Sequence, residues 1–155
     1  MTRLILRLLL LAIVALAGGA TSFAQPGKSF QGEWEWAVYA TSRDQLPPAY
    51  RNERLKDVPG AAVYLKLKQR GNKLTGEYSA SRRYLAKLEE GDLSAVVKRN
   101  TAQLELTSGF GGTVTILLSL SGNRIHWKTL KAEGEHYFPD DVFLRRVVRK
   151  KRVGR

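Results

Sequence analysis

The sequence has no cysteine and only two histidines. Without cysteine, the protein can form neither a disulfide nor a thiolate zinc site, and it cannot carry a lipid on a cysteine. The two histidines, His126 and His136, would need carboxylates from neighbouring segments to hold a metal. We therefore expect no metal site and no cofactor. A long apolar run is also missing, since the segment Leu8–Ala17 is shorter than the ~20 residues of a membrane-spanning helix.

This short apolar run is instead the centre of a predicted signal peptide. Arg3 and Arg7 precede the run, and small residues at Ser22 and Ala24 follow it. A positive start, an apolar middle and a small-x-small end are typical of a secretory signal. We expect cleavage between Ala24 and Gln25, so that residues 1–24 are removed and the mature protein is periplasmic or secreted.

The positive charge is concentrated at the C-terminal end. The formal net charge is +12, and seven of the 26 basic residues lie within the last eleven positions. A nucleic-acid-binding domain spreads lysine and arginine over a face, often with stacking aromatics, so we expect no nucleic-acid partner. We predict one domain at residues 25–148 and a basic disordered tail at residues 149–155. The tail either contacts an anionic membrane or lipopolysaccharide surface or is merely solvated, and the contacting residues would be Arg149, Lys150, Lys151 and Arg152.

Apolar and polar residues alternate with a period of two in eight segments, which lie at residues 34–40, 63–68, 73–80, 93–97, 103–107, 114–120, 124–128 and 142–144. This alternation predicts antiparallel strands with one buried and one exposed face. Gly71-Asn72 and Gly122-Asn123 suit tight hairpin turns, and a third turn is expected at Arg99-Asn100. The sequence therefore predicts an all-β fold, an antiparallel up-and-down barrel of about eight strands. An open β-sandwich is the alternative.

One connection, Thr41–Ala61, is much longer than a turn. It contains Pro47, Pro48 and Pro59, and Ala49–Lys56 could form about two helical turns. A connection of this length in a small domain is either a lid or binding loop, or an insertion tolerated at the surface.

The start of the first strand reads Phe30-x-Gly32-x-Trp34 and resembles the opening of the calycin barrels, the lipocalins and avidins. In lipocalins this tryptophan closes one barrel end, and a basic residue of the last strand packs across it. The resemblance implies that Trp34 and Arg146 have these roles, with Arg145 as the second choice. The lipocalin C-terminal helix and second motif are absent.

The similarity to avidins does not extend to biotin. Trp36 and Ala40 occupy first-strand positions at which avidins offer an asparagine and a serine to biotin. Loss of these hydrogen bonds would leave polar groups of the ligand unpaired at ~1–3 kcal/mol each. Biotin is therefore not the expected ligand.

Three aromatic residues, Trp36, Tyr78 and Trp127, share the inward parity of the predicted strands. They could form the walls of a site for a planar or apolar ligand, or they could simply fill the barrel. No serine lies in a Gly-x-Ser-x-Gly motif. Asp140 and Asp141 are adjacent, so their side chains would point to opposite faces. We expect no enzymatic activity.

The sequence thus favours an exported, non-enzymatic binding protein for a small apolar or planar ligand. The alternative is an inhibitor or immunity protein against a cell-wall-targeting enzyme, which would reach its target with Thr41–Ala61 or Ser79–Tyr84. A positively charged inhibitor would favour an acidic protein partner. An open, lined lumen would support the first function, and a filled barrel with an ordered projecting loop would support the second.

Overall fold

The computed structural model describes residues 29–148, with residue 85 excepted. The predicted signal peptide at residues 1–24 and the tail at residues 149–155 lie outside the described residues. The four basic residues assigned to surface contact belong to that tail, so these expectations stay predictions. Of the helices in the described part, none has the length and apolar character that crossing a membrane requires.

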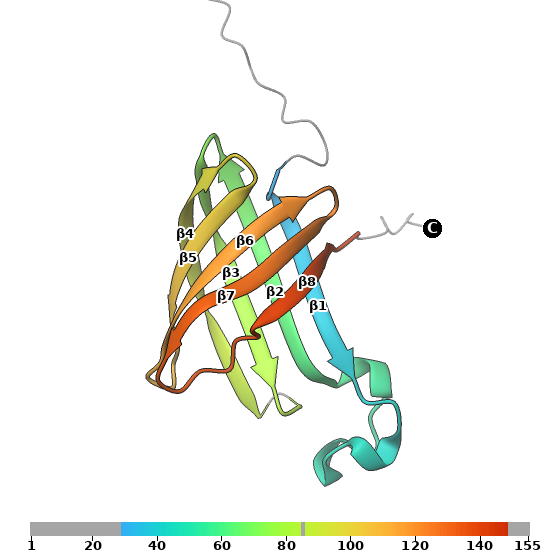
Figure 1. Cartoon of the computed structure of the whole chain (residues 1–155). Helices are drawn as coiled ribbons and strands as arrows, with labels where there is room; N and C mark the ends of the chain where they lie inside the picture. Colours follow the sequence, from blue (N-terminus) through green and yellow to red (C-terminus); the bar gives the residue numbers. More distant parts are fainter. Residues whose placement is uncertain (1–28, 85, 149–155) are drawn as a thin grey trace, which may run out of the picture.

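The fold is a closed antiparallel barrel of eight strands in sequence order (Figure 1). Each strand pairs with its neighbours in the sequence, and the last strand pairs with the first. The predicted up-and-down barrel is confirmed, and the open sandwich is wrong. The strands are β1 (Gly32–Tyr39), β2 (Pro59–Arg70), β3 (Lys73–Arg82), β4 (Lys87–Lys98), β5 (Thr101–Thr107), β6 (Thr113–Ser121), β7 (Arg124–Glu133) and β8 (Asp141–Arg146).

The three predicted hairpin turns join β2 to β3, β4 to β5 and β6 to β7. Gly71 and Gly122 both have a φ of +59°, and Arg99 has a φ of +58°. Glycine adopts this left-handed backbone without steric cost, which explains its place in two of the turns. Because strands alternate in direction, all three turns lie at the barrel end where β1 begins and β8 ends (Figure 1).

The long connection after β1 is ordered but is not an α-helix. It forms three 3-10 turns at Arg43–Gln45, Pro48–Tyr50 and Leu55–Asp57. In place of the two helical turns predicted over Ala49–Lys56 there are two separate 3-10 turns, because Arg54 is extended (φ −73°, ψ 133°) and separates them. The connection has a small core of its own, made by Ala40, Leu46 and Val58 with Tyr50, Leu55 and Tyr84 packed against it. Strand β2 also starts earlier than predicted, at Pro59.

The main core occupies the inside of the barrel and follows the period of two along every strand. In β5, for example, Ala102, Leu104 and Leu106 are buried, whereas the residues between them are exposed. The largest fully buried side chains are Trp34, Trp127, Phe30 and Phe138. The inward-facing residues of all eight strands therefore share one hydrophobic cluster.

Trp34 and Arg146 close the end of the barrel at which β1 begins. Trp34 is buried, and its indole N–H donates a hydrogen bond to the Phe30 carbonyl at 2.7 Å. The Arg146 guanidinium carbon lies 4.1 Å from the centre of the Trp34 ring, a cation–π contact. Arg146 also donates to the carbonyls of Ser29, at 3.0 Å, and of Gln31. The basic residue over Trp34 is thus Arg146, while Arg145 is exposed.

Gly32 is required by the same arrangement. Its φ is +129°, and a Cβ atom added there would lie 2.4 Å from Nη1 of Arg146. A side chain at this position would therefore both strain the backbone and displace the guanidinium. This explains why glycine stands two residues before the tryptophan.

Two of the barrel's ladders are very short. Strands β1 and β8 share two residue pairs, and so do β4 and β5. The other ladders have between five and ten pairs. Both short ladders lie at the closed end, so the strands on either side diverge toward the opposite end, which we call the mouth.

We predict that Trp34→Ala lowers the free energy of unfolding by ~3–5 kcal/mol, because it removes a buried indole and the ring beneath Arg146. Denaturant unfolding of the variant measures this change. Phe143→Ala is the control, since Phe143 is 54% exposed on the outer face, and it should cost less than about 1 kcal/mol. A loss below about 1 kcal/mol for Trp34→Ala would contradict the assigned role.

Candidate ligand-binding site at the barrel mouth

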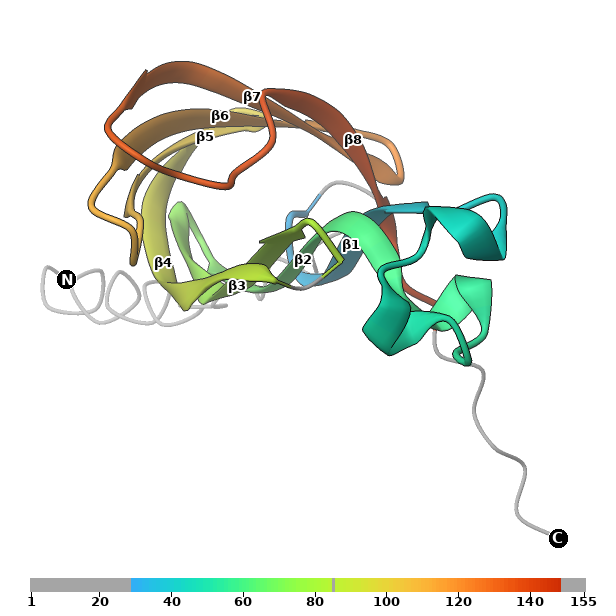
Figure 2. The same ribbon diagram turned by 90° about the horizontal axis from the view of Figure 1, so that it is seen from below.

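The connection between β7 and β8, residues 134–140, crosses the mouth of the barrel (Figure 2). Gly134 has a φ of +70° where the chain leaves β7. From this connection the side chain of Phe138 enters the core and is fully buried. We call residues 134–140 the mouth loop. The fully buried ring of Phe138 is its apolar anchor.

Phe138 contacts two of the three residues predicted to bind a ligand. Its ring centre lies 5.6 Å from that of Tyr78 and 6.2 Å from that of Trp127. Trp127 is fully buried and donates its indole N–H to the Pro139 carbonyl at 3.0 Å. Tyr78 and Trp127 therefore belong to one aromatic cluster inside the barrel, with the ring of Phe138 against both of them, and their role in ligand binding stays a prediction.

The third predicted residue, Trp36, also faces a cleft at the surface. It is partly buried against the core, and together with Val142 it lines a surface cleft of about 610 Å³ between β1 and β8. The shared inward parity predicted one site for all three aromatics. The divergence of β1 from β8 is the physical reason that Trp36 lines the cleft between these strands.

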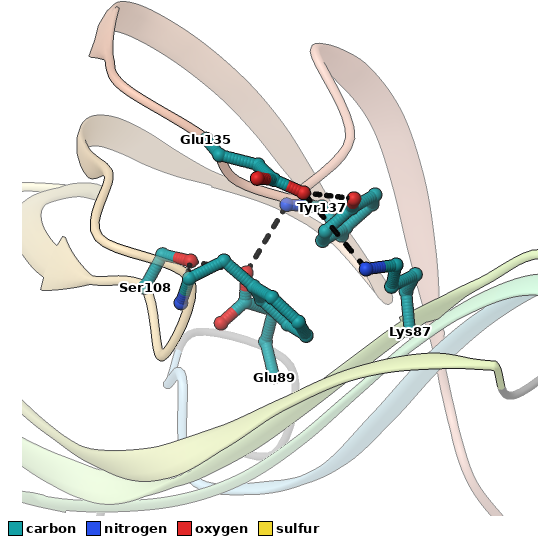
Figure 3. A network of polar contacts seen from close by, with 6 residues as sticks. Lys87, Glu89, Ser108, Glu135 and Tyr137 are labelled. Carbon is teal, nitrogen blue, oxygen red and sulfur yellow. Dashed lines mark hydrogen bonds and ion pairs between the residues drawn. The ribbon is translucent and has the colours of Figure 1, made fainter.

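A buried carboxylate at Glu89 connects the mouth loop to β4. Glu89 is only 2% exposed and accepts hydrogen bonds from the Ser108 hydroxyl at 2.6 Å and the Tyr137 N–H at 3.1 Å (Figure 3). It also accepts a third, from the Gly109 N–H at 3.0 Å. Ser108 and Gly109 belong to the β5–β6 connection, and Tyr137 belongs to the mouth loop. The carboxylate thus bridges the region in which β4 and β5 are no longer paired.

A second set of contacts surrounds Lys87 at the rim of the mouth. The ammonium of Lys87 lies 4.6 Å from the ring centre of Phe110, 5.0 Å from that of Tyr137 and 3.9 Å from the carboxylate of Glu135 (Figure 3). The Tyr137 hydroxyl donates a hydrogen bond to Glu135. These partly exposed contacts join the same two connections to β4.

Two further contacts fix the mouth loop. Arg82 of β3 donates a hydrogen bond to the Phe138 carbonyl at 3.0 Å. A Cβ atom at Gly112 would lie 2.4 Å from the Glu135 carbonyl oxygen, so the β5–β6 connection packs directly on the mouth loop. The segment Gly109–Gly112 is therefore a turn between strands, as predicted, and its last glycine permits this close approach.

Polar groups of the site have unusual surroundings. Burial and then the nearby Glu89 carboxylate raise the pKa of the Tyr78 phenol above its usual value. Nδ1 of His136 is buried without a hydrogen-bond partner among the described residues, and its ring stacks on Phe138 at 6.2 Å. The aromatic cluster therefore has at its edge a buried imidazole nitrogen that no described residue binds.

The other predicted features lie away from the mouth. His126 is on the outer surface, 2.6 Å from the Asp141 carboxylate, and no group of three metal-ligating side chains occurs in the described part of the chain. The connection Thr41–Ala61 lies beside the barrel rather than across its mouth (Figure 2). An inhibitory role for it stays a prediction.

Sequence reasoning missed Glu89, Phe138 and His136. Glu89 shares the inward parity of Leu93, so a charged residue at an apolar position was the available signal. Phe138 and His136 lie in a connection, where no periodicity indicates which side chains are buried.

We predict that Glu89→Gln lowers the free energy of unfolding by about 1–3 kcal/mol, because one side of the amide is a donor and cannot accept the N–H and O–H groups that Glu89 binds. Glu90→Gln is the matched control, since this neighbour is exposed, and it should change the stability by less than about 0.5 kcal/mol. Equal effects in denaturant unfolding would contradict the bridging role of Glu89.

The raised pKa of Tyr78 predicts a loss of stability at alkaline pH. The stabilisation is complete below the unfolded pKa of about 10 and disappears as pH rises through the higher folded pKa. Tyr78→Phe should flatten this part of the stability profile, whereas Tyr39→Phe, at a residue 44% exposed, should not. Thermal unfolding across this pH range is the measurement, and identical profiles for the two variants would contradict the prediction.

We found no protein-family model, no curated protein and no solved structure that matches this chain. The closed eight-stranded antiparallel barrel is compatible with the calycin resemblance of the sequence.

Proposed function

We propose that this protein is a non-enzymatic binding protein that holds a small planar or apolar ligand in the mouth of a calycin-like barrel. One observation carries the proposal: the ring of Phe138, on a connection, is buried against Tyr78 and Trp127. A site that accommodates a benzyl group has the shape and polarity that a ligand ring requires. The barrel interior is filled by these rings, and the connection after β1 is ordered, which by the criterion of the sequence analysis favours the alternative inhibitor. A ligand would therefore have to replace Phe138 as the mouth loop opens.

The contacts that hold the mouth loop are of a kind that water can replace. Glu89 and Arg82 bind its backbone through hydrogen bonds, and Lys87 contacts its exposed rim. Exchange of a protein hydrogen bond for one to water costs about 0.5–1.5 kcal/mol. The buried ring of Phe138 is the larger contribution, and a ligand ring would restore it. Opening and binding would therefore be coupled.

The site also indicates the ligand class. The walls are aromatic and apolar, and the unpartnered Nδ1 of His136 lies beside them. A buried polar atom without a partner costs about 1–3 kcal/mol, which a hydrogen bond from the ligand would recover. We therefore expect a flat, mostly apolar molecule with one or a few polar atoms. The predicted export would place the protein outside the cytoplasm, where it would meet such a molecule.

Fluorescence titration with N-phenyl-1-naphthylamine, a planar apolar dye that brightens on desolvation, tests the proposal. Wild-type protein should bind the dye saturably. Glu89→Gln should bind it several-fold more tightly, because opening of the mouth loop then costs less. Trp127→Leu should weaken binding, because it removes one wall of the site.

Two controls separate this site from other apolar surface. Phe143→Ala and Glu90→Gln alter exposed residues and should leave the titration unchanged. Phe138→Ala should bind the dye most tightly of all. If only Phe138→Ala binds the dye while folded wild-type protein and Glu89→Gln do not, then the substitution has created a cavity and the proposed function is wrong.

A further inference from the structure

Beyond the mouth, the barrel has an open seam between its first and last strands. After the pairs Trp34↔Arg146 and Glu35↔Arg145, β1 and β8 diverge (Figure 1). The cleft of about 610 Å³ lies along this divergence. Its two long edges are formed by Glu35, Ala37 and Tyr39 of β1 and by Asp141, Phe143 and Arg145 of β8.

The backbone groups on these edges face the cleft. The Val147 N–H donates to the Glu33 carbonyl at 2.9 Å. The backbone N–H and C=O groups of odd-numbered residues in β1 and β8 therefore point toward the other strand. The Thr129 N–H donates to the Asp140 carbonyl at 2.7 Å. The backbone N–H and C=O groups of even-numbered residues at the start of β8 therefore point toward β7. Ala37 and Phe143 would be the next pair, but the ladder of the described residues ends before them. Unpaired backbone groups of this kind accept an additional strand.

The walls of the cleft suit a strand with alternating side chains. Its inner wall contains Trp36 and Val142, which are apolar and belong to the barrel interior. Its outer rim contains Tyr39, 44% exposed, and Phe143, 54% exposed. A strand in the cleft would point every second side chain inward, onto the apolar wall.

Charge distinguishes the two ends of the cleft. At the narrow end, Arg124 and Arg145 are partners in the β7–β8 ladder, and Glu35 is the acidic residue opposite Arg145. Within residues 29–84 and 86–148, the structure shows no ion pair and no side-chain hydrogen bond of either guanidinium. At the wide end, the carboxylate of Asp141 binds His126 at 2.6 Å. The narrow end therefore has an excess of positive charge.

We propose that this cleft binds the extended C-terminal segment of another protein. The segment would pair with β1 in antiparallel orientation. Because β1 runs from the narrow end to the wide end, the segment would end at the narrow end. Its terminal carboxylate would then lie at Arg124 and Arg145, where arginine can bind both oxygens. Apolar side chains at alternate positions would pack on Trp36 and Val142. This interaction is independent of the ligand proposed for the mouth.

The test uses an N-terminally acetylated hexapeptide of alternating threonine and valine that ends in valine. One form has a free C-terminal carboxylate and the other a C-terminal amide. Both peptides are labelled, and the fluorescence anisotropy of each is measured as full-length mature protein is added. The free acid should bind, and the amide should bind about tenfold or more weakly. Arg124→Glu should weaken binding of the free-acid peptide to a similar extent. Arg70→Glu is the matched control, with the same charge change at the exposed end of β2, and should bind normally.

Hydrogen exchange locates the bound peptide. The amide of Ala37 should become protected when the free acid binds, and Phe138→Ala should bind the peptide as wild type does. Three results would overturn the proposal: no binding of the free acid by folded protein, equal binding of acid and amide, or protection confined to the mouth. If analytical ultracentrifugation shows a dimer in which the Ala37 amide is already protected without peptide, the cleft is occupied by a second copy, which would also overturn the proposal.

Discussion

The closure of the barrel depends on the contact of Arg146 with Trp34. Only two residue pairs join β8 to β1, and one of these is the pair formed by these two residues. The guanidinium covers the indole ring and binds the carbonyls of Ser29 and Gln31, so the last strand also holds the segment before the first strand. A cation above an indole that is removed from water is attracted more strongly than at an exposed site. This one contact joins both ends of the domain.

The two ends of the barrel are held together in different ways. The closed end has tight turns, both short ladders and the buried tryptophan. At the mouth, connections rather than strands span the gap, and the buried carboxylate of Glu89 holds two of them. Backbone ladders resist separation along their length, whereas side-chain contacts of this kind can be exchanged one at a time. Both proposed binding sites therefore lie where side-chain contacts replace backbone ladders, at the mouth and along the seam that leads to it.

The period of two was sufficient to predict the strands, the antiparallel barrel and the inward faces of Tyr78 and Trp127. The contact of Trp34 with Arg146, where the first and last strands meet, was predicted from the resemblance to calycins. Phe138 could not be predicted in the same way, because its burial depends on how a connection crosses the mouth. The place of Trp36 depends on the divergence of β1 and β8, which local sequence does not encode. Prediction failed where contacts between distant segments decide the outcome.

The register of the barrel also has a consequence for the order of folding. Seven ladders join strands that follow one another in the chain, whereas Trp34 and Arg146 are separated by most of the domain. Contacts between sequence neighbours close small loops and form early, while a contact of such long separation carries the largest entropy cost. A meander of hairpins can thus form first, with β1 and β8 as open edges, and the arginine reaches the indole last. Until that step the outer edges of β1 and β8 have unpaired backbone groups, and the chain is most prone to aggregate during this interval.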